Sequence, residues 1–119
     1  MLVFIHKAAE TILLTIPKMA ALFDPRCYPP NEATPGTVRG AVNCANYLRS
    51  LDTQECFVPK AGVVMCTDSG TVVKGFTDGQ ESSSSYCRDV ATAVVWILDH
   101  CPACGGDDCA IAGKYPVLP

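Results

Sequence analysis

The chain is poor in the residue types that most enzymes use for acid–base and nucleophilic chemistry. It has only two histidines, His6 and His100, and no Gly-x-Ser-x-Gly motif of the kind that presents a nucleophilic serine. Asp99 precedes His100, but this pair is predicted to be the polar end of a helix rather than a catalytic dyad. We therefore expect no catalytic residues, no enzymatic activity and no cofactor.

Charge is also scarce, and so are long apolar runs. Only 18% of the residues are charged, with 9 Lys and Arg against 12 Asp and Glu, and the basic residues are scattered singly. Nucleic acids and anionic membranes select clustered basic residues, so neither is an expected partner. No apolar run of about 18 residues occurs, so no membrane span is expected.

Cysteine, by contrast, is abundant, with eight residues in a chain of 119. An even number at this density is typical of a disulfide framework formed in an oxidising compartment. Hydrophobic residues make up 49% of the chain, which is enough to bury a core. We therefore predict a secreted, extracellular, monomeric domain without a metal site, cross-linked by Cys27, Cys44, Cys56, Cys66, Cys87, Cys101, Cys104 and Cys109.

The N-terminal segment, residues 1–23, has an ambiguous pattern. Glu10 and Pro17 interrupt the apolar stretch that a signal peptide requires. The segment is therefore a signal peptide, a pro-segment or the product of a mis-assigned start, with the true start near Met19. In each case we expect it to lie outside the core, and a single cysteine-rich domain to occupy residues 24–119.

Apolar periodicity predicts two helices. Thr34 and Pro35 are typical of an N-cap and a first helical residue, and apolar residues then recur at three- and four-residue spacing as far as Leu51. A second apolar face runs from Tyr86 to His100, and Pro102 ends that helix.

Strand signals lie between and after the helices. Two valine-rich runs within Ala61–Phe76 flank a turn at Thr67–Gly70, which predicts a hairpin. Ser82–Ser85 are predicted to form a loop that ends in a helix N-cap. Ala110–Leu118 are predicted to add a last strand, at an edge because of Pro116. The order predicts an α+β fold: a small, disulfide-rich two-layer sandwich, with an antiparallel sheet and two helices packed on one face.

The C-terminal cysteines allow two chemistries besides structural disulfides. The motif Cys-Pro-Ala-Cys at 101–104 has the spacing of a dithiol redox motif, but it closes a helix, whose negative end disfavours a thiolate. His100, Cys101, Cys104 and Cys109 are residue types that bind zinc. A thiol redox module and a zinc-binding module are therefore alternative functions.

From Cys56 onward, the order of features resembles a known family. A cysteine-tipped segment precedes a strand that ends in Val63-Val64-Met65-Cys66, followed by an Asp-Ser-Gly turn and a second strand. A serine-rich loop then leads to Cys87-Arg88, which opens a helix that closes as His-Cys-Pro-Ala-Cys-Gly at 100–105. This order is similar to the fungal secreted killer-toxin-like family, first seen as virus-encoded smut toxins, and to small cysteine-rich effectors such as the necrosis-inducing domain.

The resemblance implies both a fold and an activity. It implies an antiparallel sheet with two helices on one face, and non-catalytic growth inhibition through calcium uptake or channels. The prototype toxin depends on a lysine two residues before the strand cysteine. Val64 stands at that position here, the nearest basic residue is Lys60, and the chain is acidic where the prototype is basic. These departures favour a host-directed effector over a channel blocker.

The sequence therefore predicts a secreted, non-enzymatic effector or toxin-like protein that binds a protein or surface target on another cell, of a host plant or a competing fungus. The alternative within the same resemblance is a killer toxin that interferes with calcium channels. Candidate binding residues are polar residues on the predicted hairpin and its adjoining loops: Lys60, Asp68, Lys74 and Asp78. The alternative is that these four residues only keep the hairpin soluble.

The pairing of the cysteines is open at this level. Eight cysteines permit on the order of a hundred connectivities. We expect Cys44 to bond Cys87, which would link the two helices, and Cys27 to bond either Cys101 or Cys104.

Overall fold

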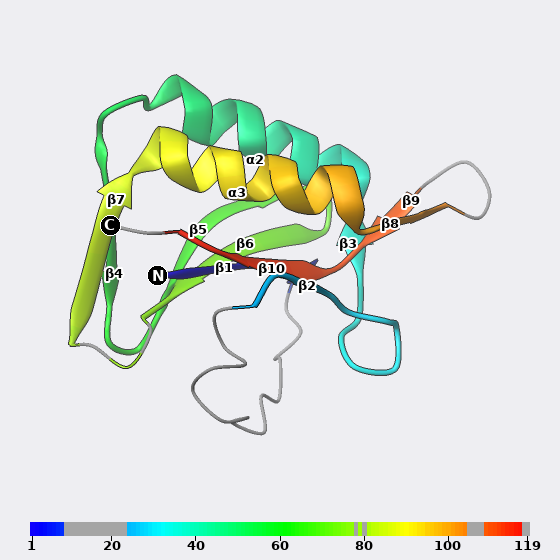
Figure 1. The fold of residues 1–119 in the computed structure, drawn as a ribbon. Helices are drawn as coiled ribbons and strands as arrows, with labels where there is room; N and C mark the ends of the chain where they lie inside the picture. The colour runs from blue at the N-terminus through cyan, green and yellow to red at the C-terminus, as the bar shows by residue number, and fades with distance from the viewer. Residues whose placement is uncertain (9–23, 78, 80, 105–108, 118–119) are drawn as a thin grey trace.

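Two helices lie side by side across one face of a five-stranded antiparallel sheet (Figure 1). The computed structural model describes residues 1–8, 24–77, 79, 81–104 and 109–117. With four disulfides, this is the predicted small, disulfide-rich α+β fold.

The elements form one main sheet, two helices and two smaller sheets. In spatial order, the strands of the main sheet are β2 (Arg26–Cys27), β10 (Gly113–Pro116), β1 (Leu2–Lys7), β6 (Thr71–Phe76) and β5 (Val63–Asp68). The helices are α2 (Val38–Ser50) and α3 (Cys87–His100). One small sheet pairs β4 (Glu55–Pro59) with β7 (Ser82–Tyr86), and the other joins β3 (Gly36–Thr37), β9 (Cys109–Ile111) and β8 (Pro102–Cys104).

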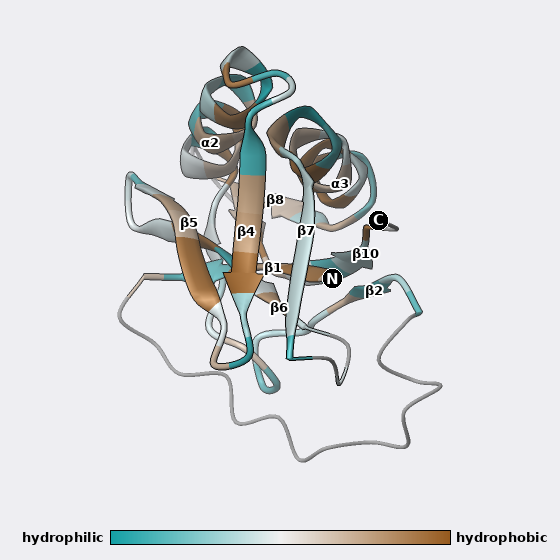
Figure 2. Cartoon of the chain, turned by 90° about the vertical axis from the view of Figure 1, so that its left-hand side faces the viewer, coloured by the Kyte–Doolittle hydropathy of each residue, from teal (hydrophilic) through white to brown (hydrophobic). Residues whose placement is uncertain are grey.

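The small sheets stand at opposite ends of the molecule (Figure 1). Figure 2 shows the ribbon of β4 and β7 upright in front of the helix ends, with β5 beside it. The core lies between the helices and the main sheet, where Val3, Leu48 and Val94 are at most 1% exposed.

β1 lies in the middle of the main sheet, between β10 and β6. The expectation that residues 1–23 lie outside the core is therefore wrong for β1, because all of its residues except Lys7 are buried and Val3 and Ile5 belong to the core. A short continuous apolar run is typical of a strand buried on both faces as well as of a leader sequence, and only the tertiary pairing separates the two readings. Residues 9–23 lie outside the described residues.

Both predicted helices are present, but the first begins later than expected. Its N-cap is Thr37, whose Oγ1 accepts a hydrogen bond from the Gly40 amide at 3.1 Å. Thr34 and Pro35 cannot begin the helix because Gly36 and Thr37 are held in β3, paired with β9.

The predicted hairpin is confirmed as β5 and β6. Ser69 and Gly70 join the strands, with φ of 48° and 77°. Two successive residues with positive φ are the signature of the tight hairpin turn whose twist matches that of the strands.

Ser82–Ser85 do not form the predicted loop and N-cap. They lie in β7, paired with β4, and the N-cap residue of α3 is Tyr86, which makes no side-chain cap bond. The serines have low intrinsic strand propensity, but pairing with β4 overrides it. Backbone carbonyls of the segment between α2 and β4 replace the cap, because Gln54 accepts from the Cys87 amide at 2.9 Å.

The C-terminal tail forms two strands, β9 and β10, rather than the single predicted edge strand. β10 lies between β2 and β1, so the expectation of an edge position is wrong. Pro116 is tolerated because β2 pairs only with Gly113 and Lys114. Beyond those two residues, β10 needs no backbone donor on that side.

All eight cysteines form disulfides: Cys27–Cys101, Cys44–Cys66, Cys56–Cys87 and Cys104–Cys109. The expected bond from Cys27 to the Cys101/Cys104 corner is made to Cys101. The expected Cys44–Cys87 bond is wrong. Both cysteines do face the core from their helices, but strands rather than the other helix supply their partners, β5 for Cys44 and β4 for Cys87.

Candidate functional site

The four predicted binding residues do not form one cluster. Asp68 lies on the helix-facing side of β5 and lines a groove there, whereas Lys74 lines a pocket on the opposite face of the sheet. Lys60 is 73% exposed in the turn between β4 and β5, where it pairs loosely with Glu81 at 3.6 Å. Asp78 lies outside the described residues.

The first hollow, which we call the α2–β5 groove, is open and has a volume of about 380 Å³. Asn43 and Tyr47 of α2 form one wall, and residues 65–68 of β5 form the other. Tyr47 is 51% exposed. Sequence reasoning missed both helix residues because they fall on the polar side of the helix, which is usually only solvated.

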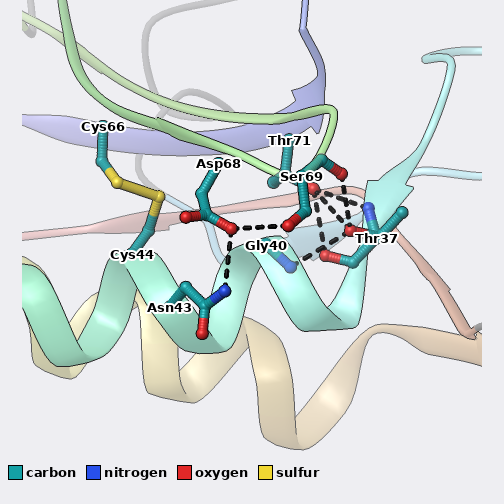
Figure 3. The surroundings of a disulfide bond; sticks show 8 residues. All are labelled: Thr37, Gly40, Asn43, Cys44, Cys66, Asp68, Ser69 and Thr71. Atoms are coloured by element: carbon teal, nitrogen blue, oxygen red, sulfur yellow. Dashed lines mark hydrogen bonds between the residues drawn. A yellow bond between two sulfur atoms is a disulfide. The ribbon is translucent and has the colours of Figure 1, made fainter.

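The Asp68 carboxylate is the charged group of this groove. Asn43 Nδ2 and Ser69 Oγ both donate to its Oδ1 atom, at 2.8 Å and 2.7 Å (Figure 3). These two hydrogen bonds lower the pKa of Asp68 below its ordinary value, because they stabilise the ionised form, and the bond from Asn43 has the larger effect. The groove therefore keeps a negative charge at one end at neutral pH.

A threonine network fixes α2 against the hairpin that carries Asp68. The Thr37 amide donates to Thr71 Oγ1 at 2.7 Å, and Thr37 Oγ1 donates to the Ser69 carbonyl at 3.0 Å (Figure 3). Beside this network, the Cys44–Cys66 disulfide joins α2 directly to β5. Both walls of the groove are thus held in place before any ligand arrives.

The second hollow, which we call the Lys74 pocket, opens on the other face of the main sheet with a volume of about 300 Å³. His6, Val64, Lys74 and Phe76 line it, together with the turn before β5. Val64 pairs with Lys74 across the ladder, so their side chains share one face. His6 was missed because residues 1–23 were set aside.

A family model described as a domain of unknown function (DUF8794) matches residues 24–116. The chain belongs to this family. No curated protein and no solved structure matches it. The match includes both helices and all eight cysteines but not β1. Since the description of DUF8794 assigns no activity, function rests on the geometry of the chain itself.

The C-terminal cysteines of this DUF8794 domain do not form the alternative redox or zinc site. Cys101 bonds Cys27, and Cys104 bonds Cys109, so 101–104 is not a dithiol pair and no thiolate of the set is left to bind zinc. His100 stacks on Trp96, with ring centroids 4.1 Å apart. In the described ranges, no three His, Cys, Asp or Glu side chains group as metal ligands.

No described helix of the DUF8794 domain combines the length and the apolar character that crossing a membrane requires.

Replacing Asn43 with alanine is expected to raise the pKa of Asp68 towards its ordinary value, because the largest cause of the lowering is removed. A carboxyl whose pKa is lowered on folding stabilises the fold above its ordinary pKa, and this contribution disappears as the pH falls through the folded value. NMR titration of the Asp68 carboxyl carbon measures the shift. Asn46→Ala, on an exposed position of the same helix, serves as the control, and equal pKa values in both variants would contradict the prediction.

Proposed function

We propose that this DUF8794 chain is a secreted binding protein without enzymatic activity, an effector or toxin-like protein that recognises a protein or surface target on another cell. One observation carries the proposal: two open hollows flank the same sheet-edge strand, β5, on a scaffold with four disulfides. Disulfides at this density form in oxidising compartments, which supports secretion.

The rigidity of β5 and its neighbours supports a binding role. A surface that is already ordered loses less conformational entropy when it binds a partner. The Cys44–Cys66 disulfide and the hydrogen bonds of Thr37 and Thr71 order one side of β5, and the ladder to β6 orders the other.

The two hollows differ in charge, which supports specific recognition. Asp68 makes the α2–β5 groove negative, and Lys74 adds a positive charge to the pocket on the opposite face. A target that spans the edge of β5 would meet both charges. Complementary charges of this kind select partners and increase association rates more than they increase affinity.

Fluorescently labelled, oxidised protein is expected to bind plant or fungal cells saturably, and excess unlabelled protein is expected to compete. Lys74→Glu should weaken binding by about tenfold, because it reverses a charge in the pocket. Arg49→Glu, the same charge change on an exposed helix position, should bind as the wild type does. Binding that never saturates, or equal losses in the two variants, would contradict the proposal.

A killer toxin that interferes with calcium channels is the second candidate, favoured by the position of Lys74. Lys74 lies directly across the ladder from Val64, the position where the family resemblance implies a functional lysine. Val64 is 52% exposed, so this face is open to a target. If this candidate is correct, the protein inhibits growth and reduces calcium uptake in the cells of the binding assay. Lys74→Gln should abolish both effects. Saturable binding with unchanged calcium uptake would leave the effector as the function.

A further inference from the structure

β5 ends the main sheet, and no other described strand pairs with its outer edge. On such an edge, the backbone N–H and C=O groups that point outward can pair with another extended chain. Peptide-binding domains use exposed edges in this way, and side-chain pockets beside the edge supply specificity. β5 has such a pocket, because its own residues form one wall of the α2–β5 groove.

The groove is built by an irregularity in β5. A bulge interrupts the ladder to β6 between Val64 and Cys66, and Met65 is the extra residue. Met65 and Cys66 both line the groove, and the disulfide from Cys66 to Cys44 keeps α2 beside the strand. A bulge also prevents long, continuous pairing, which disfavours the β5 strand of a second copy. The outer edge of β5 can therefore pair with only a short extended segment, which would lie alongside residues 66–68.

The charge at this end of the groove defines the chemistry of the segment. Asn43 and Ser69 both donate to Asp68 Oδ1, and no described side chain donates to Oδ2. No described Lys or Arg forms an ion pair with Asp68. The carboxylate is thus ionised, oriented and able to accept hydrogen bonds from a cationic side chain.

We propose that the outer edge of β5 binds an extended, basic segment of a protein partner by strand addition. A Lys or Arg of the segment pairs with Asp68 Oδ2, and an apolar neighbour on the same face packs on Tyr47. Alternate side chains of the segment point to the opposite face, where Val64 offers an apolar contact. This inference rests on the proposed binding function and names the class of its partner.

The test uses synthetic peptides and the oxidised, isotope-labelled full chain. A peptide of about eight residues that carries lysine and valine two positions apart, so that both lie on one face of the extended chain, is expected to shift the backbone amide signals of residues 64–68 saturably in NMR titration. Replacing its lysines with glutamate should abolish the shifts. Asp68→Asn should weaken binding by about fivefold, the upper end for an exposed ion pair. Asn replaces Asp with little change of shape, so this variant retains the fold.

Two controls separate strand addition from simple charge attraction. Asp89→Asn removes an equal charge from an exposed position on α3 and should leave binding unchanged. N-methylation of alternate peptide residues should abolish binding in one register and preserve it in the other, because only one edge of an added strand faces β5. Equal binding of both methylated peptides, or of the lysine and glutamate peptides, would overturn the inference.

The cell-binding assay separates this inference from the proposed function. If wild type and Asp68→Asn bind cells equally and saturably, strand addition at Asp68 is wrong and the binding function stands. If the protein shows no saturable binding to cells but binds the basic peptide at β5, the proposed function is wrong and the peptide-binding site is confirmed.

Discussion

Replacing Cys27 and Cys101 together with serine is expected to lower the free energy of unfolding by about 4 kcal/mol. The bond spans 74 residues and ties the short edge strand β2 to the end of α3. In the chain-entropy model, a disulfide stabilises the fold by restricting the unfolded chain, and longer loops gain more. The other bridges shorten the unfolded loop, but the effect depends only on the logarithm of its length.

The matched control removes the Cys104–Cys109 bond, which spans five residues between the paired strands β8 and β9. The same model gives a loss of about 2 kcal/mol for so short a loop. Urea unfolding, followed by the fluorescence of the single tryptophan, Trp96, measures both variants. An equal loss in the two variants, or a larger loss in the control, would contradict the loop-length account.

Gly40→Ala is expected to destabilise the fold by about 2–3 kcal/mol. A Cβ atom at this position would lie 2.2 Å from the Asp68 carbonyl oxygen and 2.6 Å from Thr71 Cβ. To make room for it, α2 and the hairpin must move away from each other. In an open helix the same change would stabilise by about 1 kcal/mol, because alanine is the better helix former. The sign of the measured change therefore reports the close contact of α2 with β5.

Two neighbouring variants complete this experiment. Val42→Ala lies on an exposed face of α2 and should change stability by no more than about 0.5 kcal/mol. Gly70→Ala has open space around the new Cβ but a φ of +77°, so it should show only backbone strain of about 1 kcal/mol. Thermal unfolding by circular dichroism measures all three. A Gly40→Ala protein as stable as the wild type would show that the contact is looser than described.

Patterns within one segment predicted the helices and the hairpin. The apolar face that ends at His100 buries one side of its helix against the core, so its periodicity is visible locally. The hairpin is visible locally through its two valine-rich runs and the turn residues around Gly70. The α+β class follows from the order of these elements. Local signals of this kind are most reliable where burial is one-sided.

The elements that were missed depend on distant partners. β1 is buried on both faces and has no alternation to read, and β7 is a serine strand that exists because β4 pairs with it. The disulfide partners of Cys44 and Cys87 have the same origin, since the strands that supply them are positioned only by the complete fold.

The candidate site was predicted only in part. Asp68 and Lys74 do line hollows, one on each face of the hairpin. The contribution of α2, through Asn43 and Tyr47, could not be foreseen without knowing that this helix lies beside β5. A tyrosine on the polar side of a helix was the one local signal available.

The central position of β1 determines when this protein can finish folding. β1 precedes every other described element, yet it pairs with the distant strand β10 through contacts such as Leu2 with Pro116. During synthesis the apolar residues of β1 lack one of their two partner strands until β10 has been made. Pairing across such sequence distances folds slowly and exposes strands to aggregation meanwhile. We therefore expect folding to follow synthesis and to require protection of β1 until β10 arrives.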